Sequence, residues 1–286
     1  MPTHPYTACI TGANAGIGLE LTRKLLHEGW QVIAINRSEF PTDDTHIQQA
    51  TQSRQLRPYT VTDLADYDSL RTVLHQIQQQ EQQIDVLFNN AGRSFSELSY
   101  SRQGRELHYE LMTVVPYIIL MELRQLLQRS TLRTVINTSS SAFQFTRSIS
   151  NDTLKRPQRF RKLIGPYASS KLALSLWTKA AAPSFANEGI LLRSVDPGGN
   201  NTLRKGKNSG LPLLVKPLMK LFFPPPTHGA EQLYQGAIGI HRDQRGVFIS
   251  KGKIAKLKFS DQAQEIWQQV QAIYEQEYKV GKVTLP

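Results

Sequence analysis

Tyr167 and Lys171 stand four residues apart in the segment Tyr-Ala-Ser-Ser-Lys. On a helix, this spacing brings both side chains to the same face. A tyrosine with an unperturbed pKa of about 10 exchanges protons poorly at neutral pH. A neighbouring ammonium favours the phenolate and is expected to lower the pKa of Tyr167. The pair therefore predicts proton transfer to a carbonyl oxygen or from an alcohol; a solvated helix surface is the alternative interpretation.

A glycine-rich loop lies near the start of the chain, in Thr-Gly-Ala-Asn-Ala-Gly-Ile-Gly from residue 11 to residue 18. It follows an apolar segment of strand length and precedes an amphipathic segment of helix length. Glycines in such a loop permit a tight turn and close backbone approach to a pyrophosphate, and the helix N-terminus offers free N–H groups. An ordinary strand-to-helix turn is the alternative, but the order of the elements favours a dinucleotide site. The residues expected to bind the cofactor here are Gly12, Asn14, Gly16, Ile17 and Gly18.

Asn36 and Arg37 end the second apolar segment and bear on the choice of dinucleotide. An acid at this point would bind the 2′-hydroxyl of NAD, whereas the 2′-phosphate of NADP requires a cation. The acid is absent, and the Arg37 guanidinium is available for bidentate phosphate contact. The sequence therefore favours NADP(H) over NAD(H), although Arg37 would also suit a solvated strand end.

Segments of strand length alternate with amphipathic segments of helix length along the chain. This alternation predicts one α/β domain over residues 1–286, a doubly wound Rossmann-like fold with a mainly parallel seven-stranded sheet. The expected strands are Thr7–Gly12, Gln31–Asn36, Leu56–Val61, Ile84–Asn89, Arg133–Thr138, Leu191–Val195 and Val247–Ser250. The expected helices are Gly16–Glu28, Asp66–Gln80, Arg105–Gln128, Tyr167–Asn187, Thr227–Ile240 and Asp261–Glu277.

Two stretches interrupt the alternation, Arg147–Gly165 and Gly198–Pro226. Both follow strands, and ligands of open α/β sheets bind beyond the carboxyl ends of the strands. We expect the first to line the substrate site and residues 198–226 to form an apolar substrate lid. Packing on the core or on a subunit partner is nearly as good an account of the lid's leucines and phenylalanines.

Composition narrows the function classes. The net charge is +11 but the basic residues are scattered, so nucleic-acid binding is not expected. One cysteine rules out an internal disulfide, no metal site is expected, and no signal peptide or membrane-spanning run is apparent. The sequence therefore suggests a cytoplasmic protein, in which weak peripheral contact of the lid with anionic membrane and homo-oligomer formation stay open.

Several further motifs, in order along the chain, resemble the short-chain dehydrogenase/reductase family over nearly the whole length. The spacing Gly-x-x-x-Gly-x-Gly is similar to that of the family, and Tyr167 with Lys171 resembles its active-site pair. The resemblance implies that Lys171 also holds the nicotinamide ribose. Further cofactor contacts that it implies are Asp63 and Leu64 on the adenine, Asn90, Ala91 and Gly92 on the ribose side, and Pro197, Gly198 and Thr202 at the nicotinamide.

By the same resemblance, the active serine is Ser140, with Ser139 and Ser141 as neighbours that a shift of register would promote. Met112 departs from the family, because an asparagine that anchors a water in a proton relay usually stands at this position. A thioether sulfur is a weak acceptor and donates nothing. The departure leaves open a weakened, cofactor-binding sensor or partner protein as the alternative to an active enzyme.

The long interval between Ser140 and Tyr167, with its basic residues, is similar to that of the retinol dehydrogenase branch of the family. This likeness implies NADP(H) and a lipophilic alcohol, aldehyde or ketone. The sequence thus predicts an oxidoreductase that moves hydride between nicotinamide and such a small-molecule substrate.

Overall fold

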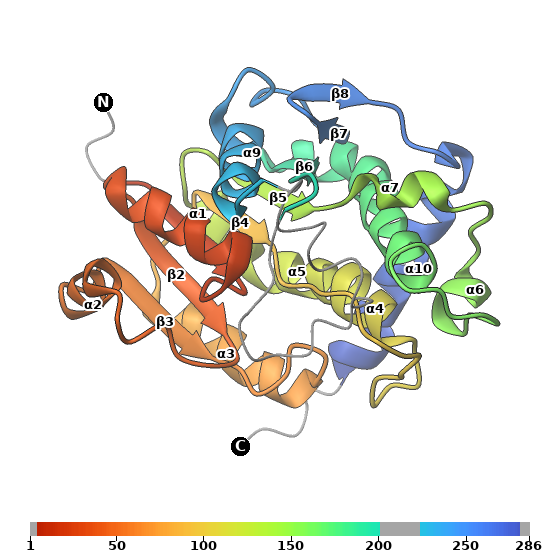
Figure 1. Ribbon diagram of the computed structural model, residues 1–286, viewed down its shortest axis with the longest axis horizontal. Coiled ribbons are helices and arrows are strands. Elements are labelled where there is room, and N and C mark those ends of the chain that lie inside the picture. Colours follow the sequence, from red (N-terminus) through yellow and green to blue (C-terminus); the bar gives the residue numbers. More distant parts are fainter. Residues whose placement is uncertain (1–4, 201–223, 281–286) are drawn as a thin grey trace.

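The computed structural model describes residues 5–200 and 224–280 of the chain. At its centre lies one eight-stranded sheet with the strand order β3-β2-β1-β4-β5-β6-β7-β8 (Figure 1). The parallel strands are β1 (Thr7–Thr11), β2 (Gln31–Asn36), β3 (Leu56–Thr60), β4 (Val86–Asn89), β5 (Thr134–Thr138), β6 (Leu191–Asp196) and β7 (Val247–Ser250). The doubly wound α/β fold predicted from the sequence is confirmed.

The eighth strand, β8 (Lys253–Ala255), was not expected from the sequence and pairs antiparallel with β7. Lys251 and Gly252 form the connection, and their φ angles are +51° and +70°. Two consecutive residues with positive φ are typical of the tight turns that join antiparallel strands. The hairpin therefore extends the parallel sheet by one short edge strand.

Strand order reverses at β1. The chain proceeds outward from β1 to β2 and β3, and then returns to place β4 on the other side of β1. Ligands of open α/β sheets bind in the crevice that forms at such a point, beyond the carboxyl ends of the strands. The glycine-rich loop follows β1, and the segment that begins with Asn90 follows β4, so both lie at this reversal.

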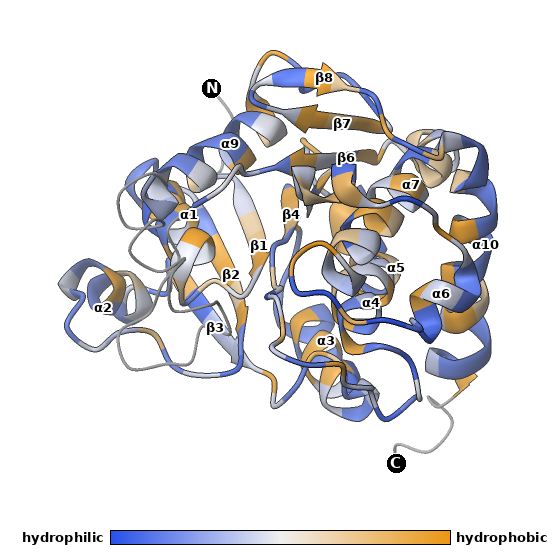
Figure 2. Cartoon of the chain, turned by 45° about the vertical axis from the view of Figure 1, so that its right-hand side comes forward, coloured by the Kyte–Doolittle hydropathy of each residue, from blue (hydrophilic) through white to orange (hydrophobic). Residues whose placement is uncertain are grey.

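Helices cover both faces of the sheet and enclose a separate hydrophobic core on each (Figure 1). One face carries α1 (Gly16–His27), α2 (Thr45–Gln52) and α9 (Pro226–Ile238). The other carries α3 (Tyr67–Gln80), α5 (Val115–Gln128), α7 (Pro166–Ala186) and α10 (Ala263–Ile273). Hydrophobic residues gather on the central strands and on helices such as α5 and α7, whereas α2 is largely hydrophilic (Figure 2). Burial of apolar side chains on both faces stabilises the parallel sheet.

Most of the expected helices are found within a residue or two of their predicted ends. The hydrophobic periodicity of the sequence did not predict α2, because only Ile47 and Ala50 of this helix are buried. It also missed α6 (Asn151–Lys155), a single turn within the basic stretch, which Ser150 caps from its N-terminal end. None of the helices among residues 5–200 and 224–280 has the length and apolar character needed to cross a membrane.

The single helix expected at Arg105–Gln128 is divided in three. A short turn, α4 (Leu107–Tyr109), leads into the π-helical turn η1 (Glu110–Val114), and α5 follows with Pro116 in its first turn. Proline has no backbone N–H, so it cannot donate the α-helical hydrogen bond to the carbonyl four residues earlier. The widened turn accommodates this loss, and it is the place where Met112 lies.

Candidate active site

The turn after β1 has the shape that a dinucleotide cradle requires. Gly12 has a φ of +68°, and a side-chain carbon added there would lie 3.2 Å from the Ala91 Cα. A side-chain carbon on Gly18 would lie 2.1 Å from the Gly12 carbonyl oxygen. Helix α1 begins without a side-chain cap, so N–H groups of its first turn stay available for phosphate oxygens. These features fit the pyrophosphate of a nicotinamide dinucleotide.

Asn14 connects the glycine turn to the chain beyond β2. Its amide Nδ2 donates to the carbonyl oxygens of Ser38 at 2.6 Å and of Glu39 at 3.0 Å. Arg37 is exposed at the start of this segment. Asn36 is buried and, among the described residues, its side-chain amide has no hydrogen-bond partner. An unpartnered buried amide costs free energy, and here it occupies the position of the NAD-selecting acid.

The predicted adenine and ribose contacts also lie at this edge of the sheet. Asp63 is exposed beyond β3 and accepts a hydrogen bond from the backbone N–H of Ala65 at 3.0 Å, and Leu64 is buried. The N–H groups of Asn90 and Ala91 both donate to the Thr11 hydroxyl, at 3.0 and 2.9 Å. Thr11 therefore ties the segment after β4 to the glycine turn.

Ser140 and Tyr167 are brought together although they come from different elements. Ser140 follows β5 and caps a short 3-10 turn, whereas Tyr167 lies in the first turn of α7. The Ser140 side chain is close enough to Tyr167 to lower the pKa of its phenol, against the larger effect of burial. Neighbouring serines lie elsewhere: Ser139 is buried against Ser175, with 2.7 Å between the hydroxyl oxygens, and Ser141 is exposed.

Lys171 is buried one helical turn after Tyr167, and its Nζ donates to the Thr138 carbonyl oxygen at 2.6 Å. Burial lowers the pKa of Lys171 to about 7, against the opposing effect of the nearby Asp196 carboxylate. Burial raises the pKa of Tyr167, and the neighbouring Ser140 side chain opposes that shift. The sequence-based expectation of a lowered Tyr167 pKa is therefore wrong for this structure, because desolvation dominates and the amine is directed to a carbonyl.

Asp196 is a member of the site that reasoning from the sequence missed. It ends β6, is buried, and accepts hydrogen bonds from the Gly198 N–H and the Ser250 hydroxyl, each at 3.0 Å. Its charge acts on the pKa of both Tyr167 and Lys171. An acid directly before the Pro-Gly pair at a strand end was the available signal.

Met112 lies beside Lys171, at the position where the sequence departs from the family. A side-chain carbon on Gly92 would lie 2.8 Å from the Met112 sulfur and 3.5 Å from the Lys171 Nζ. The thioether and the amine therefore both lie close to Gly92 of the ribose-side motif. No hydrogen-bonding group is supplied from this position.

Pro197 and Gly198 follow β6 and form a turn that Asn200 holds. The Asn200 amide donates to both of their carbonyl oxygens at 2.8 Å and accepts from the Gly229 N–H at 2.9 Å. This connects the turn to the start of α9. Thr202 and most of the expected lid, from residue 201 to residue 223, lie outside the described residues.

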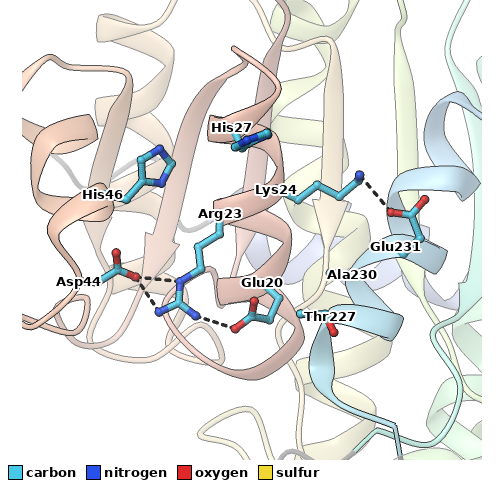
Figure 3. A pocket seen from close by; sticks show the side chains of 9 residues that line it. All are labelled: Glu20, Arg23, Lys24, His27, Asp44, His46, Thr227, Ala230 and Glu231. Atoms are coloured by element: carbon cyan, nitrogen blue, oxygen red, sulfur yellow. Dashed lines mark hydrogen bonds and ion pairs between the residues drawn. The ribbon is translucent and has the colours of Figure 1, made fainter.

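A separate cavity of about 480 Å³ lies on the outer side of α1 (Figure 3). Its charged groups bind one another: Arg23 forms ion pairs with Glu20 and Asp44, and Lys24 with Glu231. Because α1 and α9 cover the face of the sheet opposite to α7, this cavity is not part of the Tyr167 site. The Tyr167 site is thus defined by strand ends and by α7, not by this cavity.

The fold and the site define an oxidoreductase that binds a nicotinamide dinucleotide. The chain belongs to the short-chain dehydrogenase family, whose model, described as "short chain dehydrogenase", matches residues 6–151. The protein therefore acts on CH–OH or C=O groups with NAD(P).

Similar proteins include retinol dehydrogenases. The chain is 28% identical to retinol dehydrogenase 14 of Homo sapiens over 246 residues, covering 80% of this chain and 72% of that protein. It is 29% identical to short-chain dehydrogenase TIC 32 B, chloroplastic, of Brassica napus over 257 residues, covering 84% and 78%.

Solved structures share the fold. The carbonyl reductase Sniffer of D. melanogaster has a TM-score of 0.61 at 21% identity, with 87% of this chain and 98% of that chain covered. 4-hydroxyisoleucine dehydrogenase complexed with NADH has a TM-score of 0.64 at 18% identity, with 86% and 96% covered.

Proposed function

We propose that the protein is an NADP(H)-dependent oxidoreductase for lipophilic aldehydes, ketones or the corresponding alcohols, with Ser140, Tyr167 and Lys171 as its catalytic residues. The observation that carries the proposal is that Tyr167 lies one helical turn before the buried Lys171, whose Nζ donates to the Thr138 carbonyl oxygen at 2.6 Å. Together with Ser140, which follows β5, they lie at the carboxyl ends of the strands, where the glycine turn also lies.

A bound nicotinamide would supply or accept the hydride at the substrate carbon. In the direction of reduction, Tyr167 donates its phenolic proton to the carbonyl oxygen, so that an alcohol and a phenolate result. The Ser140 hydroxyl would donate its hydrogen bond to the substrate oxygen. Lys171 would hold the ribose of the bound cofactor through its amine. The phenol is protonated at neutral pH, as the reductive direction requires.

NADP(H) is preferred in this proposal because of the residues at the end of β2. No carboxylate stands at Asn36 to bind a ribose 2′-hydroxyl, and Arg37 is exposed and adjacent. A guanidinium binds a phosphate through two parallel hydrogen bonds. Asp63, Leu64, Asn90, Ala91, Gly92, Pro197, Gly198 and Thr202 are assigned to the remaining cofactor contacts.

A lipophilic substrate is supported by the likeness to retinol dehydrogenases. The apolar composition of residues 198–226 is consistent with a lid over such a substrate. A cytoplasmic location and assembly into homo-oligomers stay predictions.

A second candidate function is a cofactor-binding protein with weak turnover. Met112 favours it, because its sulfur lies against Gly92, as does the Lys171 amine, at a position where the family usually supplies a hydrogen-bonding side chain. Tight NADPH binding without turnover of any carbonyl in a broad panel would support this candidate over the first.

The proposal is tested by following NADPH oxidation against a panel of aldehydes, ketones and quinones. The wild-type protein should reduce the lipophilic members, and Tyr167→Phe should lose at least about 10²-fold in kcat while it keeps its affinity for NADPH. Tyr6→Phe is the matched control, since Tyr6 packs against Trp30 on the opposite face of the sheet. Unchanged turnover in Tyr167→Phe would refute the assigned role.

A further inference from the structure

A buried histidine contacts Tyr167 from outside the predicted catalytic group. The rings of His108 and Tyr167 meet edge to face, with their centroids 6.0 Å apart and their planes at 84°. His108 belongs to α4, the short turn that precedes η1, and only 1% of its surface is exposed. Aromatic pairs in this geometry are attractive beyond the area that they bury.

Both ring nitrogens of His108 are occupied. The backbone N–H of Phe95 donates to Nε2 at 2.9 Å, and Nδ1 lies 2.6 Å from the Glu106 Oε1. Since Nε2 accepts, the ring proton must be on Nδ1, where it is donated to the carboxylate. These two hydrogen bonds fix the ring in one orientation.

Glu106 is itself held in place. It is fully buried, and its second oxygen, Oε2, accepts from the Tyr109 N–H at 3.0 Å. Its own backbone N–H donates to the carbonyl oxygen of Lys155 at 2.9 Å, in the segment that leads to Tyr167. A carboxylate in such surroundings requires its partners, since an unpaired buried charge is costly.

The other contacts of His108 also lead to segments next to Tyr167. Phe95 lies just beyond the ribose-side motif, and its ring packs on His108 at 4.7 Å between centroids. The ring of Phe160, in the segment before α7, lies 6.3 Å from the His108 ring between centroids. His108 therefore joins the segment after β4 to the segment before α7, with the Tyr167 ring against it.

We propose that His108, fixed by Glu106, is a positioning residue that orients the Tyr167 ring for proton transfer. This inference rests on the proposed function of Tyr167 as the proton donor. Both ring nitrogens of His108 are hydrogen-bonded within the protein, so His108 cannot itself pass a proton to the substrate. It acts through Tyr167. A displacement of a reacting group by about 1 Å can cost about 10²-fold in rate.

Two substitutions separate the ring from the hydrogen bonds. His108→Gln keeps groups that can accept from the Phe95 N–H and donate to Glu106, but it removes the ring. His108→Phe keeps the ring and removes both hydrogen bonds. His75→Gln, at an exposed site on α3, is the control.

Turnover and stability should respond differently. In His108→Gln, we expect kcat to fall by about 10- to 100-fold, with the NADPH dissociation constant within about twofold of the wild type. In His108→Phe, we expect the melting temperature to fall because Glu106 and the Phe95 N–H lose their partner, and kcat to fall less than in His108→Gln because a ring still packs against Tyr167. A loss of kcat that simply follows the loss of Tm in both variants would show a structural role only and overturn the proposal.

The NMR signal of Tyr167 labelled with ¹³C at Cζ provides a readout that does not depend on turnover. It is assigned with Tyr167→Phe, and we expect it to move in His108→Gln and Glu106→Gln but not in His75→Gln. An unmoved signal in both variants would overturn the positioning role. Should the wild type turn over no carbonyl while this signal moves, the proposed function would fail and the positioning role would stand. If His108→Gln does not fold, Glu106→Gln provides the same NMR test of the positioning role.

Discussion

Lys171 donates a hydrogen bond from its Nζ to the carbonyl oxygen of Thr138, at the end of β5, at 2.6 Å. The amine is buried, and its main electrostatic partner is the Asp196 carboxylate. The lysine that the sequence identifies as the neighbour of Tyr167 is therefore directed to the end of a strand. Its pKa, lowered to about 7, has consequences for stability as well as for chemistry.

The first prediction concerns stability against pH. The unfolded chain binds a proton at Lys171 up to a pH of about 10.5, whereas the folded chain releases it near pH 7. Between these values the unfolded state binds more protons, so the contribution of Lys171 to the free energy of unfolding rises with pH. The cost of burying the charged amine is present in full below pH 7.

Lys171→Met should remove this dependence. Urea unfolding of the wild type and of Lys171→Met at pH 7, 8 and 9 measures this dependence. The amount by which the free energy of unfolding of Lys171→Met exceeds that of the wild type should shrink by up to about 1.4 kcal/mol per pH unit. Parallel curves for the two proteins would contradict the burial of an ionisable amine. The measurements stop below pH 10, because above this pH the tyrosines with raised pKa values make the free energy of unfolding fall as the pH rises.

The second prediction concerns cofactor choice. Arg37→Glu should weaken NADPH binding by about 10- to 100-fold, because the guanidinium contact is lost and a like charge faces the phosphate. NADH affinity should change by less than about threefold. Fluorescence titration with both cofactors measures this, with Arg129→Glu as the control of equal charge change at an exposed site. Equal losses for NADH and NADPH would argue against a 2′-phosphate contact.

The third prediction concerns the glycine turn. Gly18→Ala places a carbon where the Gly12 carbonyl oxygen lies 2.1 Å away, so the turn must open. We expect a loss of about 1–3 kcal/mol in the free energy of unfolding and a loss of cofactor binding. Gly29→Ala is the comparison, since Gly29 has a φ of +81° but no atoms within 4 Å.

Gly29→Ala should cost about 1 kcal/mol through its backbone conformation alone and leave NADPH affinity unchanged. If Gly18→Ala bound NADPH as the wild type does, the assignment of this turn to the pyrophosphate would be wrong. Chemical unfolding and calorimetric titration give the two quantities.

The fourth prediction concerns Met112. Met112→Asn supplies a donor and an acceptor beside Lys171, and we expect kcat to rise by up to about tenfold, a part of the ~10²–10⁴ that a positioned proton-transfer group contributes. Met112→Leu, of similar size, should leave kcat unchanged. The measurement is kcat with its solvent deuterium isotope effect, which should decrease in Met112→Asn. An equal response of the two variants would show that the position is concerned with packing alone.

Much of the fold follows from local sequence. The strands β1, β2 and β4 are continuous apolar runs because both of their faces are buried, so they are visible without tertiary information. The glycine turn and the Tyr167–Lys171 spacing are equally local, since each depends on residues within one loop or one helical turn. Short elements such as α2 and β8 were missed because their ends depend on single caps and on positive-φ turns.

The sequence by itself determined the α/β class, and it predicted the cofactor turn and the tyrosine–lysine pair, because these are properties of contiguous segments. Only the tertiary structure decided which serine meets Tyr167, the direction of the Tyr167 pKa, and the presence of Asp196 and His108 beside the site. These depend on burial and on contacts between residues far apart in the chain. Desolvation in particular has no local signal, because it is set by the side chains that fold over the group.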